Sequence, residues 1–117
     1  MTFTEATKSG FSNYVNFTGR ASRSAFWYWF LFALIVGIGA DIVDYVMDTG
    51  NLVGELWGLA TLLPNLAVGA RRLHDTDRSG FWLLIGLVPL IGWIWLLVLW
   101  CLKGTSGTNR FGGDPLV

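Results

Sequence analysis

The chain has 117 residues, of which 53% are hydrophobic and 14% are charged, and its eight Lys and Arg balance its eight Asp and Glu. A typical soluble domain carries about 25% charged residues, so this composition indicates a membrane protein and excludes an ordinary water-soluble globule. The zero net charge gives no support to nucleic-acid binding. The length fits a single membrane domain, residues 1–117.

The first predicted element is a short amphipathic helix over about residues 3–16. Side chains that recur at helical spacing are Phe3, Thr7, Phe11, Tyr14 and Val15. Thr2 or Thr4 is suited to cap its start, and Glu5 is favoured in the first turn. We expect this helix to lie on the inner membrane surface, with a structureless tether as the alternative.

Three apolar runs follow, and a spanning helix needs about 20 mostly apolar residues. They predict spans over about 25–47, 52–74 and 80–102, the last without any charge. Pro64 is expected to kink the second span. The small residues and prolines expected at helix-packing positions are Ala33, Gly37, Gly54, Gly58, Pro64, Gly86, Pro89 and Gly92. The predicted fold class is an all-α integral membrane protein, a three-helix transmembrane bundle preceded by the interfacial helix and followed by an irregular tail, residues 103–117.

The placement of Lys and Arg predicts the orientation. Six basic residues lie before the first span and between the second and third spans, whereas the charged residues among residues 41–50 are all acidic. The N-terminus is therefore expected in the cytoplasm, and three spans then put the C-terminus outside. The two basic residues of the tail would then lie outside, contrary to the usual cytoplasmic location of Lys and Arg. Three aspartates, Asp41, Asp44 and Asp48, share one helix face near Glu55 and form either a solvated acidic rim or an entry site for a cation or proton.

The stretch RRLHDTDRSG, residues 71–80, concentrates charge between two apolar runs. One interpretation is a self-satisfied loop with Arg71–Asp75 and Asp75–Arg78 pairs that only marks topology. The other is a site for anionic headgroups or a partner's acidic group, since arginine offers a planar fork to phosphate. We also expect Arg20 or Arg23 to pair with Asp75 or Asp77. The candidate contact residues are Arg20, Arg23, Arg71, Arg72, His74, Asp75 and Arg78.

His74 is the single histidine, and neither a catalytic set nor a set of metal ligands is visible around it. The sequence therefore predicts no enzyme, no metal and no cofactor.

Three motifs resemble the domain-of-unknown-function family 805, small bacterial inner-membrane proteins of the YhaH type. They are NFTGRASRSAFWYWFLF, LLPNLAVGARRLHDTDRSGFWLL and PLIGWIWLLVLWCLKGTSGTNRFGGDP, and together they cover most of residues 17–115. The resemblance implies a bacterial inner membrane but no reaction. The chain departs from the family pattern at Ala25, where an acidic residue is frequent, and at Asp77, where glycine is frequent.

Three functions remain open for a multi-pass protein of this kind. A non-enzymatic accessory or scaffold subunit, bound to a membrane-protein partner or to further copies of itself, fits the missing catalytic set. A module that binds anionic phospholipid or another anion fits the arginine loop. A small transporter would need an oligomer, because three short spans cannot enclose a pore.

Overall fold

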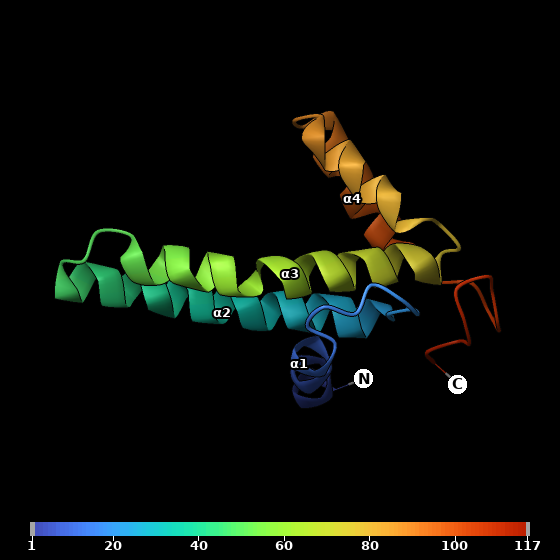
Figure 1. Cartoon of the computed structure of the whole chain (residues 1–117), viewed down its shortest axis with the longest axis horizontal. Coiled ribbons are helices and arrows are strands. Elements are labelled where there is room, and N and C mark those ends of the chain that lie inside the picture. Colours follow the sequence, from blue (N-terminus) through green and yellow to red (C-terminus); the bar gives the residue numbers. More distant parts are fainter. Residues whose placement is uncertain (1, 117) are drawn as a thin grey trace.

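The computed structural model describes residues 2–116 as a helical chain (Figure 1). Its elements are α1 (Phe3–Ser12), α2 (Arg23–Met47), α3 (Leu52–Asp75), the 3-10 helix η1 (Gly80–Leu87) and α4 (Ile91–Cys101). The only β-type pairing among these residues is an isolated bridge between Asn109 and Gly112. The all-α class is therefore confirmed.

Two long antiparallel helices, α2 and α3, form the body of the molecule (Figure 1). At about 1.5 Å per residue, their 25 and 24 residues exceed the roughly 30 Å hydrocarbon core of a bilayer. Both helices are long and apolar enough to cross a membrane.

Asp44 ties the two helices together at their turn. Its carboxylate accepts hydrogen bonds from the N–H groups of Val53 and Gly54, both at 2.9 Å, and from the Thr49 hydroxyl at 2.5 Å. The start of α3 is thus capped by a side chain from α2, as expected for an acid at a helix N-terminus. Of the four acids at this end, Asp44 is buried as a cap and the other three are exposed.

The short helix α1 crosses beneath α2 (Figure 1). Thr2 and Glu5 form the reciprocal capping box at its start, and the helix ends at Ser12, four residues before the expected boundary. Phe11 packs edge-on against Trp29 with ring centroids 5.2 Å apart. Gly10 allows this close crossing, because a side chain there would overlap the Trp29 ring.

The third apolar run is broken, so the expected continuous helix over 80–102 is wrong. The chain turns at residues 88–90 and returns, making a hairpin of η1 and α4 (Figure 1). Pro89 has no N–H to donate, and Leu90 adopts φ 66° and ψ −65° in a tight turn closed by the Ile91 N–H on the Pro89 carbonyl. Gly92 lies against the Ile85 backbone, where a Cβ would overlap the carbonyl oxygen.

Both ends of this hairpin therefore lie at the end of α3 that carries Arg72. The Arg72 guanidinium donates to the carbonyls of Trp100 and Leu102, and the Thr105 N–H donates to the Asp75 carbonyl. The tail thus starts beside the beginning of α2, and the expected three-helix transmembrane bundle is not confirmed.

The remaining packing residues have separate roles. Trp57 fills the space that Ala33 and Gly37 leave on α2, and its indole N–H donates to the Ala33 carbonyl at 3.0 Å. Gly54 lies against Asp41 and Asp44, whereas the space beside Gly58 is open and would accept a methyl group.

Helix α3 continues through Pro64, which is fully buried. Because Pro64 has no N–H, the Ala60 carbonyl four residues earlier loses its helical partner. The Tyr14 hydroxyl donates to that carbonyl from the segment after α1. The proline is therefore accommodated by a donor from elsewhere in the chain.

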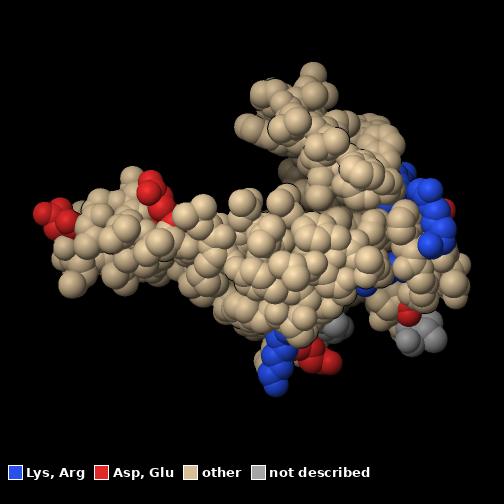
Figure 2. Space-filling view, viewed as in Figure 1, with Lys and Arg blue, Asp and Glu red and all other residues tan. Residues whose placement is uncertain are grey.

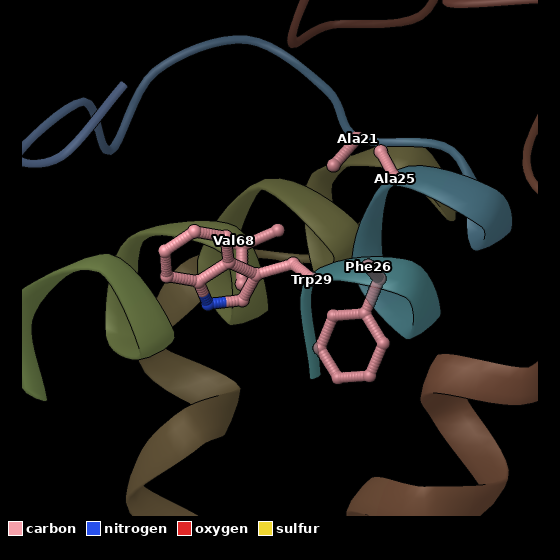
Figure 3. Packing of buried hydrophobic residues seen from close by; sticks show 5 residues of the cluster. All are labelled: Ala21, Ala25, Phe26, Trp29 and Val68. Carbon is pink, nitrogen blue, oxygen red and sulfur yellow. The ribbon is translucent and has the colours of Figure 1, made fainter. Parts of the chain in front are cut away.

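The apolar core lies where α2 begins and α3 ends. Figure 3 shows its members Ala21, Ala25, Phe26, Trp29 and Val68. The Trp29 indole donates to the Asn65 side-chain oxygen at 2.8 Å, so its polar edge is satisfied inside the pair. This core underlies the charged residues described next.

Candidate functional site

A buried ion-pair network of Arg20, Arg72 and Asp75 lies at the end of α3. Asp75 accepts from Arg20 Nε at 2.9 Å and from Arg72 at 2.6 Å, and these side chains are at most 5% exposed. The expected pairing of Arg20 or Arg23 with Asp75 or Asp77 is therefore present as Arg20–Asp75. Buried ions are tolerated when paired and fully hydrogen-bonded, and both conditions hold here.

Backbone carbonyls complete this network. Arg20 donates to the carbonyls of Thr105, Gly107 and Gly112, and Arg72 to those of Ala21, Trp100 and Leu102. Gly104 packs on the Asp75 carboxylate, which a Cβ would overlap. The glycine-rich tail therefore folds onto the loop after α3 and supplies three carbonyls to Arg20, whereas the end of α4 supplies the Trp100 and Leu102 carbonyls to Arg72.

His74 anchors the tail on a second face of the same region. Its Nδ1 donates to the Gly19 carbonyl at 2.9 Å, since a carbonyl can only accept, and its ring stacks on Phe111 at 4.0 Å between centroids. Asn109 donates to the His74 carbonyl at 2.9 Å. Arg110 lies over the Phe111 ring at 4.7 Å. Through these contacts, His74 links the segment before α2 and the tail to the end of α3.

Arg71 points to a different place from Arg72. It is 5% exposed, and its Nε makes a long bond of 3.4 Å to the Ala67 carbonyl. It lines a cavity of about 190 Å³ together with Ser9 of α1, Ser22 and Ala25 at the start of α2, and Pro115 of the tail. The expected Arg71–Asp75 pair is absent, because Asp75 turns to Arg20 and Arg72 instead.

The two outermost arginines of the candidate set stay outside this network. Arg78 is half-buried and donates to the Thr76 carbonyl at 3.3 Å, not to Asp75 as expected. Arg23 is exposed at the first turn of α2. Of the seven candidates, the structure thus joins Arg20, Arg72 and Asp75 into one network, places His74 beside it against the tail, places Arg71 in the cavity and leaves Arg23 and Arg78 at the rim.

The tail residues were missed as part of the site. Their contribution is mainly backbone, which the residue types in the sequence do not display. One signal was available: RRLHDTDRSG and the tail GTSGTNRFG are the two most specific motifs of the family resemblance, and here they contact each other.

A family model described as a protein of unknown function, DUF805, matches residues 14–113. The chain belongs to the DUF805 family. It is 49% identical to the inner membrane protein YhaI of Escherichia coli K12 over 104 residues, 88% of each chain. It is 43% identical to the inner membrane protein YhaH of the same strain over 108 residues, 88% of this chain and 89% of that one. No solved structure matches it.

These relatives and the two long apolar helices make the chain a small inner-membrane protein of a family without assigned function. The similarity extends to the uncharacterized E. coli K12 protein YiiR, 29% identical over 130 residues and 85% of each chain. The stretch RRLHDTDRSG and the tail segment GTSGTNRFG lie inside the matched region, so the loop and the tail that folds on it belong to the family domain.

The structure shows the surroundings of Asp77 and Ala25, the two positions at which the sequence departs from the resembled pattern. Asp77 adopts φ 61°, a left-handed conformation that favours glycine and that Asp tolerates better than most residues. It also gains an exposed pair with Arg110 at 3.2 Å. Ala25 lines the cavity that Arg71 also lines.

Proposed function

We propose that this DUF805 protein crosses the inner membrane twice, through α2 and α3, with both termini in the cytoplasm. The η1–α4 hairpin would enter the inner leaflet and leave on the same side. This arrangement puts all eight Lys and Arg on the cytoplasmic side and leaves only Asp41, Asp44, Asp48 and Glu55 at the outer turn. Figure 2 shows acidic side chains at the α2–α3 turn, basic ones mainly toward the opposite end, and one basic group beside an acidic one below the middle of the molecule.

We further propose that the protein is a non-enzymatic accessory or scaffold subunit. The observation that carries this proposal is the apolar hairpin, which leans away from α3 (Figure 1). Phe81 and Leu87 are each 80% exposed on it, and Ile91 is 72% exposed. The buried Arg20–Arg72–Asp75 network holds the C-terminal end of the hairpin through the Trp100 and Leu102 carbonyls, and Gly80 at its start lies close to Ala70 and His74. Solvation by lipid alone would not require a fixed angle. A rigid apolar arm held beside two spans suits contact with another membrane protein.

A photo-crosslinking amino acid at Leu87 in living cells tests the scaffold role. Leu59, 70% exposed in the middle of α3, is the matched control because it faces the lipid in the proposed topology. We expect a discrete protein adduct from Leu87 and none from Leu59. Equal labelling from both positions, or no protein adduct from Leu87 or its neighbour Ile91, would contradict a docking arm.

Binding to anionic phospholipid is the second candidate function. Eight bases and four acids (Glu5, Asp75, Asp77 and Asp114) lie on the proposed cytoplasmic side, a surplus of four positive charges. Such a surplus attracts anionic headgroups, at about 1 kcal/mol per base near the surface. An oligomeric transporter is less favoured, because two spans supply even less wall for a pore than three.

A further inference from the structure

The Arg71 cavity is enclosed by four separate parts of the chain. Ser9 comes from α1, Ser22 and Ala25 from the start of α2, Arg71 from the end of α3, and Pro115 from the tail. Its volume of about 190 Å³ is far more than the roughly 10–15 Å³ that one water molecule requires. The cavity is thus large enough for a small polar group.

Arg71 enters this cavity without a charged partner. Arg71 is only 5% exposed. Its one side-chain hydrogen bond within residues 2–116 is donated by Nε to the Ala67 carbonyl at 3.4 Å. Neither terminal nitrogen of the Arg71 guanidinium has a hydrogen-bond acceptor within residues 2–116, and both retain some contact with solvent. A guanidinium so buried is stabilised by an anion that accepts from its fork.

The start of α2 adds a second attraction for negative charge. Ser22 caps this helix by accepting the Ala25 N–H at 3.2 Å, and both residues line the cavity. The Arg23 N–H, at the first helical position, has no acceptor among the described residues. Free N–H groups and the helix dipole make such a terminus suited to phosphate.

The charges around the cavity remain positive in sum. Arg20 borders it but has committed its donors, and Asp75 is neutralised by Arg20 and Arg72. The other nearby carboxylate, Asp114, accepts the N–H groups of Gly107 and Leu116 at 3.0 and 2.9 Å. Among residues 2–116, this region therefore holds four bases (Arg20, Arg23, Arg71 and Arg72) and two acids (Asp75 and Asp114).

We propose that the Arg71 cavity binds a single phosphate group, held by the Arg71 fork and the N-terminus of α2. A phospholipid headgroup and free inorganic phosphate share this chemistry. The inference does not depend on the scaffold role, since a protein with or without a docking partner can hold an anion here. It assigns to Arg71 alone the anion-binding part that the sequence suggested for the whole arginine loop.

The full chain, purified in a neutral detergent, is titrated with inorganic phosphate against chloride at constant ionic strength, and binding is followed by thermal unfolding. In a second arm, nanodiscs of phosphatidylcholine with and without phosphatidylglycerol replace the detergent, and retained lipid is measured by native mass spectrometry. Saturable stabilisation in the first arm identifies free phosphate as a ligand. Selective retention of phosphatidylglycerol in the second identifies the headgroup.

Arg71→Gln is expected to weaken whichever binding is found at least tenfold, and Arg78→Gln, a half-buried arginine outside the cavity, is the matched control. Should Arg71→Gln fail to fold, Ser9→Leu fills the cavity from α1 without touching the guanidinium and is expected to abolish binding. No saturable binding in either arm overturns the proposal. Equal losses in Arg71→Gln and Arg78→Gln would also overturn it, since they indicate diffuse charge attraction.

Discussion

Asp75 is the residue on which the charged end of the molecule depends most. It receives two buried arginines, and its own carbonyl accepts the Thr105 N–H at 2.7 Å. Removing one partner of a buried pair leaves an uncompensated charge and costs about 3–5 kcal/mol. Here two guanidinium groups would lose their counter-ion at once.

We therefore expect Asp75→Asn to lower the free energy of unfolding by about 3–5 kcal/mol, measured by thermal unfolding in detergent. Asp77→Asn is the control, because the Asp77–Arg110 pair is exposed and such pairs contribute about 0–1 kcal/mol. Similar losses from both substitutions would mean that the buried network is not the main support of this end.

Tyr14 and Pro64 form a coupled pair that is testable on its own. The Tyr14 hydroxyl donates a hydrogen bond to the Ala60 carbonyl, which has no helical donor because Pro64 lacks an N–H. Tyr14→Phe should destabilise the protein by about 0.5–1.5 kcal/mol, the net contribution of a typical hydrogen bond, because this bond lies at an exposed position of the fold. In a Pro64→Ala background, the N–H of residue 64 can donate to the Ala60 carbonyl, so Tyr14→Phe should lower the free energy of unfolding much less. Identical costs in the two backgrounds of this double-mutant cycle would refute the coupling.

Residue types predicted part of the charged site. The prediction that Arg20 or Arg23 would pair with Asp75 or Asp77 rested on their shared place at cytoplasmic helix ends, and one of these pairs, Arg20–Asp75, is present. The pairs expected inside the loop did not form, because sequence spacing does not reveal that Arg20 and Arg72 both reach Asp75. The carbonyl acceptors from Thr105, Gly107 and Gly112 were invisible for a different reason, since every residue carries one.

At the scale of elements, the η1–α4 hairpin depends on close contact at Gly92. A methyl group there would overlap the Ile85 carbonyl, whereas the space beside Gly58 in α3 is open. Gly92→Ala should destabilise the protein by about 1–3 kcal/mol through overpacking and increase hydrogen exchange over residues 80–101. Gly58→Ala should be neutral or stabilise by up to about 1 kcal/mol, the helix-propensity gain. The reverse order would show that the hairpin is not packed as described.

The elements differ in how far the sequence predicts them. Hydropathy and length correctly predicted α2 and α3 to within two residues of their observed bounds. Hydropathy and length also predicted a single helix over 80–102. They measure how apolar a segment is, and they carry no information on where the backbone turns. The turn depends on Pro89 followed by Leu90 with a positive φ, and leucine rarely adopts that conformation. The tail was correctly expected to be irregular, but its contacts with Asp75 and His74 depend on the hairpin returning it there.

At the scale of the whole molecule, the proposed topology predicts which positions are accessible from outside the cell. With Cys101 replaced by Ser, single cysteines are introduced at Ser12, Asn51 and Ser106. An impermeant thiol reagent should label only position 51 in intact cells, and all three after permeabilisation. Labelling of position 106 in intact cells would restore three spans, and labelling of position 12 would reverse the orientation.

The Arg20–Asp75 pair also has a consequence for the order of synthesis. Arg20 leaves the ribosome early, but its partner lies 55 residues later and its carbonyl acceptors at 105, 107 and 112 come last. At about 5–20 residues per second, this guanidinium waits several seconds before its acceptors are complete. A nascent chain halted before residue 105 would therefore hold Arg20 without its three tail carbonyls.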